Sequence, residues 1–302
     1  MEASPGQPLR PLNFGEVLDV SLNVVVKNLK PLLAAVAVVV VPVQILSTVV
    51  LLSTVPDLFF DPAAAEDPES LALDAGQTAA AIGGFTVTIV FGLVGTVLAT
   101  GACFKAISDA YLGEPPSWRE SLHFALRRLR QLLWVTLLYG VLTTLAVVLL
   151  VVPAVYLWVA WAVAIPAVLV EDVRGRRALG RSFRLIRGRW WASFGILLIG
   201  FLIAAVVQVV VGLAFGLVTL LAPESLLVNV LGNGIGTALA AVLATPIQAA
   251  FIAILYFDLR VRKEGFDLLQ LAERIGASPD RARSGSPYVG APAAAPGSRA
   301  EP

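Results

Sequence analysis

Few side chains in this chain could carry out chemistry, and the sequence does not bring them into a recognisable set. The 302 residues include one histidine, His123, and one cysteine, Cys103. His123 falls in an amphipathic segment and Cys103 in an apolar run, so we interpret them as an interfacial and a small buried side chain. No Ser-His-Asp triad, pair of buried carboxylates or metal-ligand cluster can be assembled. We therefore expect no catalytic residue, metal or cofactor, and predict that the protein is not an enzyme.

Arginine is the residue type whose spacing predicts an interaction. Seven arginines lie between residues 174 and 189, and Trp190 and Trp191 follow them. A basic amphipathic helix of this kind lies in the headgroup layer with its basic side chains toward lipid phosphate. We predict that four of these arginines contact anionic lipid headgroups: Arg181, Arg184, Arg187 and Arg189. The alternative is that the arginines only set the topology, and nucleic acid is not an expected partner because membrane segments tether this helix at both ends.

The elements that position these residues, on either side of the basic segment, are predicted to be membrane spans. Hydrophobic residues make up 58% of the chain and charged residues 14%, against roughly 45–50% and 25% in soluble domains. Asp, Glu, Lys and Arg are absent from five long runs: 31–56, 75–104, 131–170, 190–223 and 225–257. Each run exceeds the roughly 20 residues that cross a hydrocarbon core. The sequence therefore excludes a soluble globular protein.

The run 131–170 is too long for one crossing and predicts two. As a single helix it would extend about 60 Å, twice the hydrocarbon thickness. Pro153 lies near its middle and lacks a backbone donor, so we expect a tight turn there. With the single spans predicted by the other four runs, the chain has six spans: 31–53, 82–104, 132–151, 154–170, 193–221 and 231–256.

The distribution of basic residues predicts the orientation of these spans. All 22 lysines and arginines fall in the N-terminal segment, 105–130, 171–189 or the C-terminal tail. Basic residues stay on the cytoplasmic side of membrane spans, and a single crossing by 131–170 would place 105–130 and 171–189 on opposite sides. We therefore predict a multi-pass protein of the bacterial inner (cell) membrane with both termini in the cytoplasm. The bacterial origin is inferred from a composition rich in Ala, Val, Gly and Arg.

A short amphipathic segment precedes each odd-numbered span, at 12–30, 116–131 and 174–189. Shifts of 104 and 161 residues align Leu18, Leu122 and Leu179, and one helical stripe continues from each. We predict an all-α polytopic membrane bundle of six transmembrane helices in three hairpins, each preceded by a cytoplasmic interfacial helix. Any amphipathic helix entering a membrane shows such a stripe, so genuine repetition and coincidence both stay open.

This bundle is predicted to be a single domain over residues 1–276, followed by a tail at 277–302. Pro, Ala, Gly and Ser dominate the tail, which predicts a disordered cytoplasmic segment.

Polar residues and glycines within the spans predict helix packing. No ionisable side chain lies in a predicted span, which argues against a proton-coupled or ion pathway. Three amides, Gln44, Gln208 and Gln248, are expected to form interhelical hydrogen bonds; the alternative is that they line a transport path. The pairs Gly212–Gly216 and Gly232–Gly236 have the GxxxG spacing that allows two helices to approach closely.

Three short blocks carry a resemblance to known proteins. They are residues 11–19 (PLNFGEVLD), 178–185 (ALGRSFRL) with 188–191 (GRWW), and 256–260 (YFDLR) with 263–267 (KEGFD). Over residues 10–270 the chain resembles a family of bacterial, mainly actinobacterial, six-span membrane proteins of uncharacterised function. It is similar to the membrane domain that precedes the catalytic domain in some glycerophosphodiester phosphodiesterases. The resemblance implies a membrane domain but no activity, because the catalytic barrel would need about 250 further residues and a histidine pair.

These observations favour a non-enzymatic accessory or scaffold bundle that contacts anionic membrane lipids, or a membrane or cytoplasmic protein partner. The alternative is a transporter or permease for an uncharged or lipid-like solute. Substrate, partner and oligomeric state are not defined by the sequence.

Overall fold

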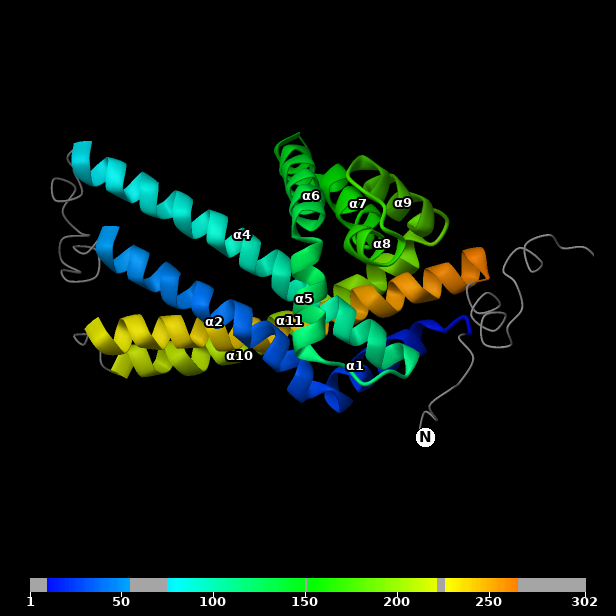
Figure 1. Ribbon diagram of the computed structural model, residues 1–302, viewed down its shortest axis with the longest axis horizontal. Coiled ribbons are helices and arrows are strands. Elements are labelled where there is room, and N and C mark those ends of the chain that lie inside the picture. Colours follow the sequence, from blue (N-terminus) through cyan, green and yellow to red (C-terminus); the bar gives the residue numbers. More distant parts are fainter. Residues whose placement is uncertain (1–9, 55–74, 150, 222–225, 266–302) are drawn as a thin grey trace, which may run out of the picture.

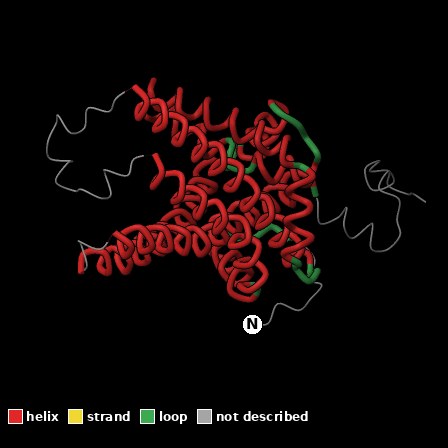
Figure 2. The backbone as a smooth tube through the Cα atoms, turned by 60° about the vertical axis from the view of Figure 1, so that its left-hand side comes forward, coloured by secondary structure: helices red, strands yellow, loops and turns green. Residues whose placement is uncertain are grey.

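The computed structural model describes residues 10–54, 75–149, 151–221 and 226–265, and these are helical apart from short connections (Figures 1 and 2). The helices are α1 (Phe14–Lys27), α2 (Leu29–Thr54), α4 (Ala75–Leu112), α5 (Trp118–Arg127), α6 (Leu129–Leu149), α7 (Val151–Ala160), α8 (Ala164–Glu171), α9 (Arg176–Ile186), α10 (Trp190–Leu221) and α11 (Leu226–Glu264). The predicted all-α class is confirmed. The predicted tail at 277–302 lies outside the described residues.

Within the described residues, six stretches of helix are long and apolar enough to cross a membrane. They are Leu29–Val50, Thr78–Leu112, Leu129–Val148, Val151–Glu171, Trp190–Leu221 and Val228–Glu264. Consecutive stretches pack side by side as α2 on α4, α6 on α7 and α10 on α11, which confirms the three predicted hairpins. Two helices continue well past their predicted spans, α4 to Leu112 and α11 to Glu264.

The second hairpin differs from the prediction at Pro153. Pro153 is the third residue of α7 rather than a turn. The first turn of a helix tolerates proline because the N–H groups there have no intrahelical acceptor. The predicted helix 154–170 is interrupted between Ala160 and Ala164, where hydrogen bonds span three residues instead of four. Pro166 accounts for this break, because a proline ring clashes with the carbonyl four residues earlier.

The three predicted amphipathic segments form α1, α5 and α9, and the helices that follow them shift the register of the predicted alignment. Ser21, Ser121 and Ser182 are each 0% exposed where their helices meet the bundle. These serines are related by shifts of 100 and 161 residues. The predicted shift of 104 also matches buried residues, since it places Val17 and Ser21 on Ser121 and Ala125. The following helices α2, α6 and α10, however, start at Leu29, Leu129 and Trp190, so a shift of 100, one helical turn shorter, fits the second copy better. The same register continues into the following helices, where Leu32, Leu132 and Ser193 are all buried.

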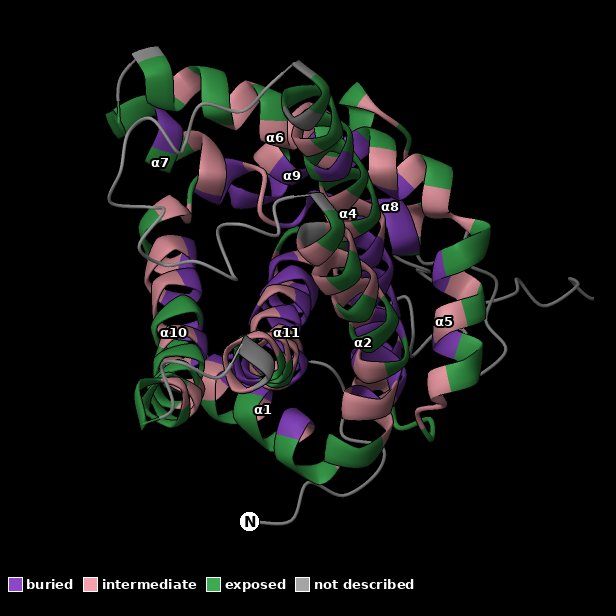
Figure 3. Cartoon of the chain, turned by 90° about the vertical axis from the view of Figure 1, so that its left-hand side faces the viewer, coloured by how far each residue is buried: buried purple, intermediate pink, exposed green. Residues whose placement is uncertain are grey.

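The core lies in one half of the bundle, and α11 is at its centre. α11 packs against α1, α2, α4, α8, α9 and α10. Its Phe251, Tyr256 and Phe257 are the largest fully buried side chains among the described residues, and Figure 3 shows much of α11 in the colour of buried residues. The far halves of the long helices expose large apolar side chains such as Phe85 and Leu213, as expected for surfaces whose solvent is lipid. Figure 1 shows α2, α4, α10 and α11 extending to the left, whereas α6 runs toward the top.

Glycine sets the distance between α10 and α11. A Cβ added to Gly236 would lie 2.9 Å from both Cβ and Cγ of Phe215, and one added to Gly232 would lie 2.9 Å from Thr219 Cγ2. The predicted close approach at Gly232–Gly236 is therefore confirmed. Gly212 and Gly216 have no heavy atom within 4 Å of such a Cβ, so this second pair is not used for packing among the described residues.

We predict that Gly236→Val lowers the stability of the bundle by about 2 kcal/mol, because the added methyl groups would overpack the contact with Phe215. Gly216→Val is the matched control, since it makes the same change on an open surface of the partner helix. Thermal unfolding of the purified protein in detergent measures both. Equal losses for the two variants would contradict this interpretation.

Candidate functional site at the charged end of the bundle

The three sequence blocks that carry the family resemblance meet at one end of the bundle. We call this the charged end: α1, α5 and α9 gather here with the last turns of α4, α8 and α11 (Figure 1). The first block begins α1, the second forms much of α9 and the start of α10, and the described part of the third lies at the end of α11. Segments separated by up to about 250 residues in the sequence thus form one site.

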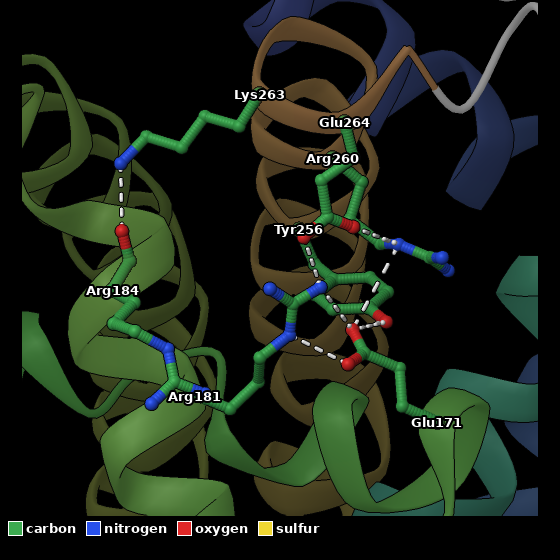
Figure 4. Close-up of polar contacts among 7 residues, drawn as sticks. All are labelled: Glu171, Arg181, Arg184, Tyr256, Arg260, Lys263 and Glu264. Carbon is green, nitrogen blue, oxygen red and sulfur yellow. Dashed lines mark hydrogen bonds and ion pairs between the residues drawn. The ribbon is translucent and has the colours of Figure 1, made fainter. Parts of the chain in front are cut away.

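A partly buried ion pair joins α8 to α9. The Arg181 guanidinium donates from Nε to Oε2 of Glu171 at 2.6 Å and from Nη2 to Oε1 at 3.0 Å. Both side chains are largely enclosed, at 17% and 16% exposure. The Tyr256 hydroxyl of α11 donates to the same Oε1 at 2.8 Å (Figure 4). The two-pronged geometry is the strongest arrangement for an arginine and a carboxylate.

Two further charges of α11 complete this network. Glu264 forms ion pairs with Arg181 and with Arg260, the latter at 3.3 Å. Arg260 also lies 3.8 Å from Glu171 (Figure 4). Two arginines and two glutamates therefore alternate, and their formal charges cancel. Burial alone would lower the pKa of Arg181, but its hydrogen bonds and ion pairs with the two glutamates raise that pKa above the ordinary value. Arg181 is therefore charged at every accessible pH.

Basic side chains cap the ends of α8 and α9. The Lys263 ammonium of α11 donates to the carbonyls of Arg184 at 2.7 Å and Arg187 at 2.5 Å. Arg128 donates to the carbonyls of Val168 at 3.1 Å and Leu169 at 2.6 Å. The last carbonyls of a helix have no intrahelical donor and carry partial negative charge. Cations from neighbouring helices satisfy them here and fix where α8 and α9 end.

The N-terminal block is clasped to α11. The Leu12 amide donates to Oδ1 of Asp258 at 2.8 Å, and Asp258 is only 3% exposed. Arg262 donates to both oxygens of this carboxylate at 2.9 Å and also to the Leu12 carbonyl.

α1 starts directly after this clasp, with its own cap. The Asn13 amide donates to Oε2 of Glu16 at 2.7 Å, and Arg10 pairs with Glu16. The hydrogen bond from Arg10 is the main reason why the pKa of Glu16 is lowered.

The four arginines predicted to contact lipid do not share one environment. Arg184 and Arg187 are exposed, and Arg189 is partly exposed. Arg181 instead points into the bundle and is held by Glu171 and Glu264. The prediction for Arg181 therefore needs correction, because a guanidinium already shared between two carboxylates positions α9 rather than contacting a headgroup.

The apolar face of α9 is also turned into the bundle. Its buried residues are Ala178, Leu179, Ser182, Leu185 and Ile186. The Ser182 hydroxyl donates to the Ala160 carbonyl at 2.9 Å, at the break between α7 and α8. α9 therefore packs on protein rather than inserting its apolar face among acyl chains.

Sequence reasoning did not identify Glu171, Tyr256, Asp258 or Glu264 as members of a site. Glu171 follows a run of forty residues without a charge, and Asp258 follows another long one. A carboxylate at such a boundary leaves water on folding and must be paired. That signal predicts pairing, but it does not give the partner.

The charged end presents charges but does not assemble reactive groups. Within the described residues, no group of three His, Cys, Asp or Glu side chains could hold a metal ion. His123 is exposed on α5, and Cys103 is buried in α4. The Tyr256 hydroxyl is already committed to Glu171. The arrangement can join helices electrostatically and display the arginines that remain.

The fold defines the chain as an all-α polytopic membrane protein. Residues 122–278, just over half of the chain, match the model of the family described as Domain of unknown function (DUF8558), and the chain belongs to that family. The matched region starts in α5 and includes all the residues of the Glu171–Arg181 network. No curated protein and no solved structure matches the chain.

We predict that Glu171→Gln destabilises the protein by about 3 kcal/mol, because it leaves the enclosed Arg181 short of one of its two carboxylates. The double variant with Arg181→Gln is expected to lose less than the sum of the single variants, since the two groups interact. Thermal unfolding in detergent provides this cycle. Arg184→Gln, on the exposed side of α9, serves as the control and is expected to change stability by less than about 0.5 kcal/mol. Additive losses would contradict a direct pairing.

Proposed function

We propose that this protein is a non-enzymatic accessory or scaffold bundle of the bacterial inner membrane whose charged end contacts anionic lipid headgroups. The contact uses Arg184, Arg187 and Arg189. One observation carries the proposal: Arg184 and Arg187 are exposed, and no acidic side chain among the described residues pairs with them, whereas Arg181 on the same helix is enclosed by carboxylates.

The aromatic residues next to these arginines support a position at the lipid headgroups. Trp190 stacks on Tyr156 at 5.6 Å and on Phe194 at 5.3 Å between ring centroids, and donates from Nε1 to the Tyr156 carbonyl. Trp191 is 78% exposed. Tryptophan concentrates at the boundary between headgroups and acyl chains. Each arginine near an anionic surface contributes about 1 kcal/mol of attraction.

The same proposal places the charged end, with both termini, in the cytoplasm. The support is the segregation of all 22 basic residues from the acidic connections between spans. Basic residues near span ends stay on the cytoplasmic side, where the leaflet carries anionic lipid.

A scaffold also needs a protein partner, and the resemblance to the membrane domain of glycerophosphodiester phosphodiesterases suggests a membrane or cytoplasmic enzyme in that role. The alternative function, transport of an uncharged or lipid-like solute, has no specific observation in its favour. Gln208 is exposed, Gln44 and Gln248 are half-buried, and no hydrogen bond in the described part of the chain joins the three amides.

We predict that replacing Arg184, Arg187 and Arg189 together with glutamine lowers the affinity for phosphatidylglycerol by about 100-fold, since three charges that contribute about 1 kcal/mol each are lost. Native mass spectrometry of the protein released from nanodiscs of phosphatidylcholine and phosphatidylglycerol counts the retained lipids. The matched control replaces the same three residues with lysine, which keeps the charges. Retention unchanged by the glutamine variant would reject the lipid contact.

We predict opposite labelling of Glu66→Cys and Arg184→Cys by a membrane-impermeant maleimide. Glu66, in the acidic connection between the first two spans, is expected to react in intact cells. Arg184→Cys is expected to react only after permeabilisation. The unmodified chain is the control, because its single cysteine, Cys103, is buried. Equal reactivity at both positions in intact cells would overturn the orientation.

A further inference from the structure

We propose that the turn between α8 and α9 is a second, separate site that binds a phosphate group. The turn borders an open depression of about 560 Å³ lined by Asp172, Val173, Arg174 and Arg177. This depression lies at the start of α9, whereas the lipid contact proposed above uses its end. The inference extends that function by adding a phosphate ligand, but it does not depend on Arg184, Arg187 or Arg189.

The backbone and a tryptophan hold the turn in place. Asp172 has a φ of 52° and Gly175 a φ of 57°, both in the left-handed region. A Cβ on Gly175 would lie 3.3 Å from Nε1 of Trp134 on α6, so glycine allows the turn to approach the indole. Arg128 anchors the other side, because its guanidinium donates to the carbonyls at the end of α8.

The charge of the depression is positive and only partly compensated. The lining holds two arginines, Arg174 and Arg177, and the single carboxylate of Asp172, which leaves a formal charge of +1. Arg128 lies beside that carboxylate and adds a further positive charge next to the depression, which an anion can neutralise. Asp172 is 52% exposed, and its contacts are long, at 3.4 Å to Arg174 and 3.9 Å to Arg128. No side-chain hydrogen bond or ion pair engages the guanidinium of Arg177 among the described residues, whereas its backbone N–H is bonded to the Arg174 carbonyl. Guanidinium groups with free donors match the oxygens of phosphate.

The Asp172 carboxylate therefore competes with a phosphate ligand for the guanidinium groups of the turn. Its carboxylate takes up part of the donor capacity of Arg128 and Arg174, and an arriving phosphate would displace it. A phosphate monoester or diester supplies more acceptor oxygens than one carboxylate and can reach Arg177 as well. The two sources of such a group at this position are a lipid headgroup and a free phosphate compound.

The test uses the full chain in nanodiscs of phosphatidylcholine. Calorimetry with inorganic phosphate and with glycerol 3-phosphate examines the free source. Native mass spectrometry after adding phosphatidic acid to the nanodiscs examines the lipid source. Binding in either arm supports the site and identifies its source, whereas no binding in both arms overturns it.

Variants of the lining residues assign the binding to this turn. Arg174→Gln with Arg177→Gln is expected to weaken binding about tenfold. Asp172→Asn is expected to tighten it severalfold, because it removes the competing charge, and asparagine tolerates the left-handed backbone. Arg176→Gln, an exposed neighbour outside the lining, is the matched control. The triple glutamine variant at Arg184, Arg187 and Arg189 is expected to keep this binding, which separates the two proposals. If neither lining variant changes the affinity, the site is wrong.

Discussion

The structure depends on how charges at the edge of an apolar medium find partners. The last turns of α11 carry Asp258, Arg260, Arg262, Lys263 and Glu264, and their contacts reach different segments of the chain. Asp258 and Arg262 hold the N-terminal block, Arg260 and Glu264 close the network around Glu171, and Lys263 caps α9. Removing charges from water is costly unless they are paired. This requirement fixes α1, α8 and α9 on one helix.

Pairing divides the arginines of α9 into two groups with different roles. Arg181 faces α11 and forms ion pairs with two carboxylates. Arg184 and Arg187 are exposed, and no ion pair within the described residues occupies their guanidinium groups. One basic segment thus both attaches itself to the bundle and displays charge on its surface. The turn that precedes it repeats this division, since Arg128 caps α8 while Arg177 stays available.

Packing is uneven along the spans for a related reason. Lipid chains are as apolar as leucine, so burial of apolar surface does not drive helices together within a membrane. Close contact occurs where small residues permit it, as at Gly232 and Gly236, or where polar groups join helices at the charged end. In the halves of the long helices that lie away from the charged end, many large apolar side chains are exposed on the surface of the bundle.

The sequence by itself determined that the long apolar runs are suited to lipid rather than water, and it determined the all-α class, the six spans and the three short helices that precede the hairpins. Those properties are local, because hydropathy, charge and helical stripe are summed over neighbouring residues. Only the tertiary structure decided that Arg181 pairs with Glu171, that Leu12 pairs with Asp258, and that α6 starts 100 residues after α2 rather than the 104 of the predicted alignment. These depend on which helix faces cross, and that choice joins residues separated by 10 to 246 positions. A local pattern shows that a charge needs a partner, whereas the crossing of the helices selects it.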